Sequence, residues 1–319
     1  MARFIARRLI GMVFVLFAVS VIVFFIFNVI PTDPAQRIAG KNATPQLVEN
    51  VTKELGLDKP LPVQYATMMK KIFSGELISY SSRLNVDEQI KQRVPATLAL
   101  SIGAAILWMF FGILFGYVSA TRANTLTDRL LTIFAIGGIS MPVFLLADIF
   151  LYFLCHKLEL FPEGGYATLS EGPYEWLSHL ILPWITLAIL YAGFYSRVLR
   201  SSMLDVMGED YVRTARAKGL SLRRVRLRHI LRNSLIPVIT LFGLDFGAVI
   251  GGAAILVENI FSINGVGFYA VEEGIAKEDF PVIMAVTILG AFFVVLFNAV
   301  VDIAYAYLDP RIRLGSSAQ

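Results

Sequence analysis

Three aspartates stand out chemically in this chain, because each is surrounded in sequence by apolar side chains. They are Asp148, Asp245 and Asp302. A carboxylate is costly inside a bilayer, so in a membrane-spanning segment it is by default a candidate for lining a transport pathway. We interpret Asp148 and Asp245 in this way, with a structural partner on a neighbouring helix as the alternative for Asp245. Asp302 lies near the end of its segment, where it can reach water or an arginine of the C-terminal tail.

Residue patterns for catalysis are missing from the sequence. No G-x-x-x-x-G-K-[ST] motif occurs, so the chain has no P-loop with which to bind and hydrolyse ATP. The three histidines lie far apart without metal-ligand spacing, and the single Cys155 can form neither an internal disulfide nor a metal cluster. We therefore expect no catalytic site and no cofactor or metal bound by this chain. Any driven transport must take its energy from a partner.

The composition is that of an integral membrane protein. Hydrophobic residues make up 56% of the chain, charged residues only 16%, and the mean hydropathy is +0.68. A net charge of +4 could suit nucleic acid, but the positive charge lies on short loops between apolar runs, which membrane topology explains better. We therefore expect contact with membrane lipid and none with nucleic acid.

The apolar runs predict an all-α membrane protein with six transmembrane helices. These are residues 9–30, 96–120, 130–155, 180–196, 235–257 and 281–308. The first run is too long for the apolar core of a signal peptide and has no cleavage site after it, so we expect it to be uncleaved. The predicted parts are the N-terminus and first helix (1–30), an extracytoplasmic domain (31–95) containing a helix from 61 or 62 to 73, a five-helix core (96–308) and a tail (309–319).

Charge predicts the orientation. Of the 28 Lys and Arg residues, 17 lie on one side of the six-helix arrangement and 11 on the other. Nine of those 11 lie in the loop 31–95, and Lys and Arg in long loops have the least influence on orientation. The side with the excess stays in the cytoplasm. The sequence thus predicts a multi-pass protein of the bacterial cytoplasmic membrane, with both termini in the cytoplasm.

Residues 209–237 form the most basic part of the chain. Together with Arg197 and Arg200 they hold 10 of the 28 Lys and Arg residues. The segment 210–218 has no helix breaker, Gly219 suits a left-handed turn, and Ser221 can cap a second helix over 222–236. We expect a cytoplasmic loop built as helix, glycine turn, helix. Its arginines alone would also serve to anchor it at anionic headgroups.

The fifth apolar run is dense in small residues. Seven glycines and alanines occur between positions 243 and 254. Small side chains let helices approach closely where lipid provides no hydrophobic drive for association. This run should therefore pack tightly against another helix.

The basic segment resembles the EAA loop of bacterial ABC importer permeases. The residues that carry this resemblance are Thr214, Ala215, Gly219, Leu235, Ile236 and Pro237. Arg213 and Thr214 replace the Glu and first Ala of the strict consensus, and the gap from Gly219 to Pro237 is long; both features are typical of the oligopeptide and dipeptide branch. That branch is also matched by LGLDKPLPVQY at 55–65, QRVPATLAL at 92–100, VENIF, GVG and the final YLDPRIR. GELISYSSRLN at 75–85 departs from its wording, and Asn264 replaces its usual proline.

The resemblance implies a type I ABC importer permease that is not itself an enzyme. It implies a second homologous permease subunit, two ABC ATPase subunits that bind ATP and Mg, and an extracytoplasmic binding protein. The implied substrate is a peptide, with a nickel chelate, glutathione or an oligosaccharide as alternatives. In this family the short helix before the glycine docks into a groove on an ATPase, so the implied coupling residues are Asp210, Arg213, Thr214, Ala215, Ala217, Gly219 and Pro237.

Two other classes remain open at this stage. An ATPase-independent secondary transporter or channel would use the intramembrane aspartates as ion sites. The sequence shows no internal repeat, which such transporters usually have. An intramembrane enzyme would need a nucleophile and base, a metal-ligand spacing or paired carboxylates, and none of these stands out.

Overall fold

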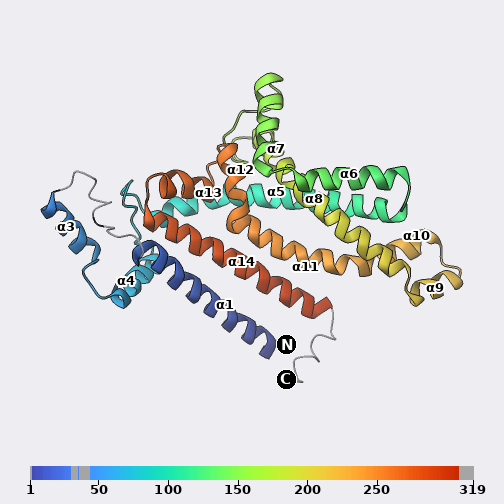
Figure 1. The fold of residues 1–319 in the computed structure, drawn as a ribbon, viewed down its shortest axis with the longest axis horizontal. Coiled ribbons are helices and arrows are strands. Elements are labelled where there is room, and N and C mark those ends of the chain that lie inside the picture. Colours follow the sequence, from blue (N-terminus) through green and yellow to red (C-terminus); the bar gives the residue numbers. More distant parts are fainter. Residues whose placement is uncertain (1, 30–34, 36–43, 309–319) are drawn as a thin grey trace.

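The computed structural model describes residues 2–29, 35 and 44–308. Within these ranges the chain consists of helices joined by turns, with an isolated antiparallel bridge between Ile78 and Asn85. The long helices form an elongated bundle (Figure 1): α1 (Ala2–Phe24), α5 (Val86–Thr121), α8 (Pro173–Met207), α11 (Arg232–Ala248) and α14 (Phe280–Leu308). Helix α1 packs on α14, α14 on α11, α11 on α8, and α8 on both α5 and α6 (Leu126–Ser140).

In the described ranges, five helices are long and apolar enough to cross a membrane, or six if one bent pair counts as a span. The predicted sixth run is confirmed as α14, and the predicted short helix is confirmed as α4 (Leu61–Ser74). Helix α1 continues as a π-helical segment (Phe25–Val29), and a further helix, α3 (Pro45–Leu55), precedes α4. The tail 309–319 and residues 30–34 and 36–43 lie outside the described residues.

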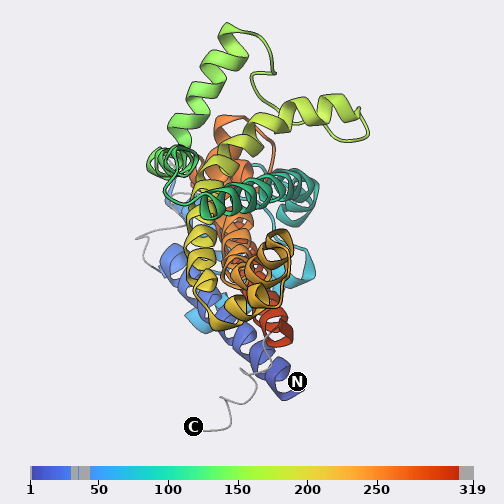
Figure 2. The ribbon, with the colours of Figure 1, turned by 90° about the vertical axis from the view of Figure 1, so that its right-hand side faces the viewer.

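The third predicted span is wrong as a single straight helix. Instead α6 is followed by α7 (Val143–Phe150) with a π-helical extension (Leu151–Lys157), and the two parts are inclined by 100°. Pro142 causes the break, because proline lacks the N–H that a continuing helix would need, and its φ of −58° and ψ of 135° are not helical. Figures 1 and 2 both show α7 projecting from the bundle.

The predicted boundary between the basic loop and the fifth span is also wrong. One helical stretch, kinked at Gly252, runs through α10 (Leu222–Arg224), a π-helical segment (Val225–Leu231), α11, a second π-helical segment (Val249–Ala253) and α12 (Ala254–Ile260). Pro237 lies inside α11 rather than at a helix start. Ile230, Ser234 and Val238 are fully buried at four-residue intervals on either side, so packing holds the helix together although the proline removes one backbone hydrogen bond.

Two spans are longer than predicted. Helix α5 begins at Val86 because the Asn85 side chain caps it, accepting a hydrogen bond from Glu88 N at 3.0 Å, and Pro95 is accommodated inside the helix. Helix α8 extends the fourth run at both ends. The apolar runs therefore mark only the middle parts of these helices.

The expected close packing by small residues is confirmed between α11 and α14. Gly243, Gly247 and Gly251 recur every four residues and lie against α14. A Cβ on Gly243 would come within 1.6 Å of a Val301 methyl, and one on Gly251 within 2.8 Å of the Gly290 carbonyl oxygen. Any larger side chain in this stripe would push the two helices apart.

Candidate functional site

Helix α9 (Asp210–Ala217) is the short helix that the sequence predicts, and it lies at one end of the bundle beside α10 (Figure 1). Its inner face buries Val212 at 0% and Ala215 at 6% exposure, and both join the main core with Val225 and Ile230. The other side chains of the helix are exposed, namely Asp210, Tyr211, Arg213, Thr214, Arg216 and Ala217. Ala215 thus packs closely as expected, but against its own chain.

The turn after α9 has the predicted left-handed geometry. Gly219 has a φ of +76°, the Gly219 N–H donates to the Arg216 carbonyl at 2.9 Å, and the Leu220 N–H donates to the Ala215 carbonyl at 3.4 Å. This pair of bonds is a Schellman motif. A Cβ on Gly219 would meet no described atom within 4 Å, so the position needs glycine for its backbone angle and not for space.

Other contacts fix how α9 sits on the bundle. The Asn233 side-chain amide donates to the Tyr211 hydroxyl at 2.7 Å, which joins α9 to α11. The Thr214 hydroxyl donates to the Asp210 carbonyl at 2.9 Å. Ser221 precedes α10, but its side chain makes no capping bond to the described backbone, so that part of the prediction is wrong.

The structure gathers most of the predicted coupling residues at this end of the bundle. Asp210, Arg213, Thr214, Ala217 and Gly219 are all exposed on α9 or in its exit turn. The exposed Asp210 and Arg213 form a loose ion pair of 3.5 Å. Pro237 lies within α11, outside this group.

A buried ion pair that the sequence analysis missed holds the neighbouring helix ends. Arg200 on α8 donates from Nε and Nη2 to the two oxygens of Asp128 on α6, at 2.8 Å each. Asp128 also accepts hydrogen bonds from the Ser119 hydroxyl and, at 2.8 Å, from Asn124 N. Bidentate geometry of this kind fixes orientation as well as adding energy. The only sequence signal is an aspartate between two arginines, at 122 and 129, in a short loop.

The three intramembrane aspartates differ in their surroundings. Asp245 on α11 is half-buried and accepts a hydrogen bond from the Tyr195 hydroxyl at 2.8 Å. The Asp148 side chain is exposed on α7 and makes no hydrogen bond or ion pair with any described residue. Asp302 pairs with Arg8 of α1 at 2.6 Å, while the tail arginines that the sequence also offered as partners lie outside the described residues.

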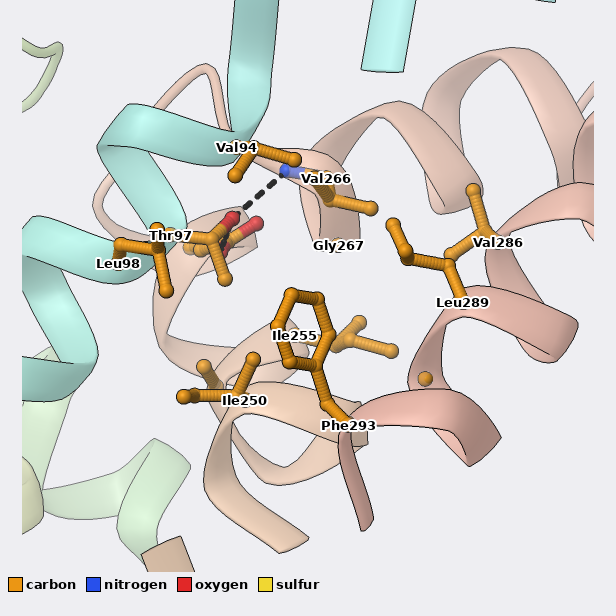
Figure 3. A pocket seen from close by; sticks show the side chains of 14 residues that line it. Val94, Thr97, Leu98, Ile250, Ile255, Val266, Gly267, Val286, Leu289 and Phe293 are labelled. Atoms are coloured by element: carbon orange, nitrogen blue, oxygen red, sulfur yellow. Dashed lines mark hydrogen bonds between the residues drawn. The ribbon is translucent and has the colours of Figure 1, made fainter. Parts of the chain in front are cut away.

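The opposite end of the bundle is organised by a buried carboxylate. Glu258 on α12 is 0% exposed and accepts from the Thr97 hydroxyl at 2.6 Å and from Phe268 N at 2.9 Å. Thr97 in turn accepts from Val266 N at 2.9 Å, at the start of α13 (Val266–Tyr269), as the dashed line in Figure 3 shows. These bonds fold the chain back at an elbow, residues 258–275. Mainly apolar side chains of α5, the π-helical segment Val249–Ala253, α12, α13 and α14 line the narrow cavity beside it (Figure 3).

The unusual segment 75–85 has a structural role at this same end. The hydroxyls of Ser79 and Ser81 donate to one oxygen of Asp279 at 2.6 and 2.9 Å, and Ser81 N donates to it at 2.8 Å. Asp279 is 1% exposed at the start of α14. Burial, together with the nearby Asp279 carboxylate, raises the pKa of Tyr80 to about 12. The serines of this segment therefore tie it to α14.

Two kinds of binding site matter at the ends of the bundle: clusters of metal ligands and exposed surfaces. In the described part of the chain, no three His, Cys, Asp or Glu side chains lie close enough together to hold a metal ion. The α9 end instead presents an exposed polar face on a rigidly held short helix. Such an arrangement can bind another protein and pass on its motion.

Comparison with known proteins covers nearly the whole chain. Residues 112–314 match the family described as "Binding-protein-dependent transport system inner membrane component", and residues 1–101 match its N-terminal counterpart. The protein named "Probable peptide ABC transporter permease protein y4tP", from Sinorhizobium fredii, is 38% identical over 98% of this chain and 100% of its own length. The protein named "Glutathione transport system permease protein GsiC" is 39% identical in Escherichia coli O6:H1 and 38% identical in strain K12, each over 98% of this chain and 99% of its own.

Proposed function

Since the chain belongs to the family of binding-protein-dependent transport system inner-membrane components, the permeases of ABC importers, we propose that it forms half of the transmembrane pathway of a peptide importer. A second, homologous permease subunit supplies the other half. Two ABC ATPase subunits bind ATP and Mg and drive transport, and an extracytoplasmic binding protein delivers the substrate. Family membership favours this assembly over an ATPase-independent transporter or channel.

The observation that carries the proposal is that α9 has one buried apolar face and one exposed polar face. On its apolar face Val212 and Ala215 are buried against the rest of the chain, whereas its polar face is exposed. A helix that only anchored the loop would not need a Schellman turn and a link to α11 through Asn233. We assign the exposed face, with Asp210, Arg213, Thr214 and Ala217, to contact with an ATPase subunit.

The two ends of the bundle then take different sides of the membrane. The α9 end carries the largest cluster of Lys and Arg and would face the cytoplasm, with both termini. The elbow 258–275, α3, α4 and the segment 75–85 would face outward and receive the binding protein. The hydrogen bonds from the serines at 79 and 81 to Asp279 support this, because they hold segment 75–85 against the start of α14, which follows the elbow in the chain.

The substrate class is inferred from the relatives. One is named a peptide permease and others glutathione permeases, at nearly equal identity to this chain. Peptides are our first assignment and glutathione the second. The binding protein that delivers the substrate would decide between them.

The test is reconstitution of the complete importer in liposomes. The chain alone in detergent should hydrolyse no ATP, since it has no P-loop. Together with two ATPase subunits, the second permease and the binding protein, it should take up a tripeptide only when ATP is supplied. The matched control carries a P-loop lysine substitution in the ATPases and should show no uptake. Hydrolysis by the isolated chain, or uptake without ATP, would overturn the assignment.

A further inference from the structure

Asp245 is a carboxylate for which the described residues supply no counter-charge. No Lys, Arg or His occurs between positions 232 and 277, nor in the apolar parts of α5 and α14 that pack against α11. Among the described residues Asp245 has no ion-pair partner, and its one hydrogen bond comes from Tyr195. Arg200 on α8 already forms an ion pair with Asp128. Arg197 follows Tyr195 by two residues, about 200° further round the helix, and so points away from Asp245.

The carboxylate is also reachable. Its side chain is half-buried, and Tyr195 occupies only Oδ2, so Oδ1 remains free to accept from another donor. On the same side of α11, Leu244 is 43% exposed and Ala248 is exposed. A carboxylate turned toward lipid would cost on the order of 3 kcal/mol, so this side of the helix should meet water or another polar group instead.

Aromatic rings surround the buried side of the carboxylate. Trp108 lies 4.6 Å from Tyr191 and 6.4 Å from Tyr195 between ring centroids, with Phe242 and Phe246 close by. Tyr191 is partly exposed, while Tyr195 is 1% and Trp108 0% exposed. The indole N–H of Trp108 is buried and has no hydrogen-bond partner in the described part of the chain. A carboxylate beside aromatic faces is a suitable environment for an organic ammonium group.

Further along the helical stretch that contains Asp245, Gly252 interrupts the helical dihedrals with a φ of 177° and a ψ of −35°, and a Cβ there would meet no described atom within 4 Å. Between the two positions the exposed residue is the small Ala248.

We propose that Asp245, flanked by Tyr191 and held in place by Tyr195, is the point in the pathway that receives the α-ammonium group of a passing peptide. The inference rests on the proposed peptide function and deepens it. Tyr195 acts as a positioning residue, since its hydrogen bond to Oδ2 leaves Oδ1 directed at the ligand.

A zero-length cross-link tests the contact directly. A carbodiimide activates a carboxyl group, which then forms an amide with an amine that touches it. In the complete importer incubated with tri-alanine, mass spectrometry should find the tri-alanine amide on Asp245, and should find none with N-acetyl-tri-alanine or on the exposed Asp148. An amide between Asp245 and a lysine of the second permease would overturn the proposal, because the counter-charge would then be structural. A carbodiimide adduct without amide, or no reaction at Asp245, would overturn it as well.

Uptake measurements give the functional readout. Asp245→Asn should lower ATP-driven uptake of tri-alanine about tenfold, the effect of losing one charge-assisted hydrogen bond, while ATP hydrolysis stays within about twofold of wild type. Asp245→Glu should restore part of the uptake, and Glu175→Gln, at an exposed carboxylate in the first turn of α8, serves as the control with uptake near wild type. Wild-type uptake itself tests the proposed function, so the two failures are distinguishable. Equal uptake by wild type and Asp245→Asn would overturn the subsite.

Discussion

The two ends of the molecule use charge in opposite ways. At the end of the bundle that contains the elbow, Glu258 and Asp279 are buried and their oxygens accept hydrogen bonds from within the chain. At the α9 end, apolar contacts and a backbone turn hold the helix, and the charged side chains of Asp210, Arg213 and Arg216 are exposed. The end with the elbow satisfies its buried carboxylates within the chain, whereas the α9 end leaves its charged side chains exposed and able to bind a partner.

This difference separates a structural role for charge from a binding role. Removing a buried acceptor leaves its donors unsatisfied, which costs more than removing an exposed charge. Exposed charges contribute little to stability but can select a partner. Substitutions at the elbow should therefore damage the fold, whereas substitutions on the exposed face of α9 should damage assembly.

The largest effect is expected for Glu258→Ala. The change leaves the Thr97 hydroxyl and Phe268 N without their acceptor in a site that excludes water, so we expect a loss of about 3 kcal/mol in stability. Thermal unfolding in detergent, followed by size-exclusion chromatography, measures it. Glu272→Ala, at an exposed glutamate of the same elbow, is the matched control and should unfold like wild type. A normal unfolding temperature for Glu258→Ala would show that the elbow does not depend on this carboxylate.

A smaller, local effect is expected for Ala215→Asp. The new carboxylate would have to enter the apolar contact with Val212 and Val225, so α9 should detach from the bundle at a cost of about 2 kcal/mol. Hydrogen exchange over residues 209–221 should rise. Ala217→Asp on the exposed face of the same helix should leave exchange unchanged. If both variants exchange alike, α9 does not have the inner and outer faces described above.

The smallest effect on the fold is expected when Arg223 and Arg224 are both changed to Gln. Both side chains are exposed on α10, so stability should not change measurably, and ATP-driven uptake should fall less than in Gly219→Val. Gly219→Val places a β-branched residue at positive φ, a strain of about 1 kcal/mol or more in the turn that positions α9. Normal uptake by Gly219→Val, with uptake abolished by the double arginine change, would reverse the comparison and assign the loop to electrostatic anchoring.

The sequence correctly predicted features that depend on neighbouring residues, such as turns and short helices. Gly219 predicted its own turn, the small residues of the fifth run predicted the α11–α14 contact, and the basic segment predicted a short helix before that turn. Boundaries set by tertiary packing were predicted poorly. Burial of Ile230, Ser234 and Val238 keeps α11 continuous past Pro237, whereas Pro142, in a run just as apolar, bends the chain by 100°.

Contacts between residues distant in sequence were also not predicted. Asp128 meets Arg200, Glu258 meets Thr97, and Asp279 meets Ser79, with separations of 72, 161 and 200 residues. A single sequence carries no signal for such contacts. The pairing of Asp302 with Arg8 on α1 was likewise not predicted.

The central claim is that the exposed face of α9 contacts an ATPase subunit, and a cross-link tests it most directly. A photoreactive maleimide would be attached to Ala217→Cys in the complete importer, with Glu88→Cys, exposed near the start of α5 at the opposite end, as control; the native Cys155 is 2% exposed and should not compete. Illumination should join the chain to an ATPase subunit from position 217 and not from position 88. A cross-link to the ATPase from position 88, or none from position 217, would contradict the account.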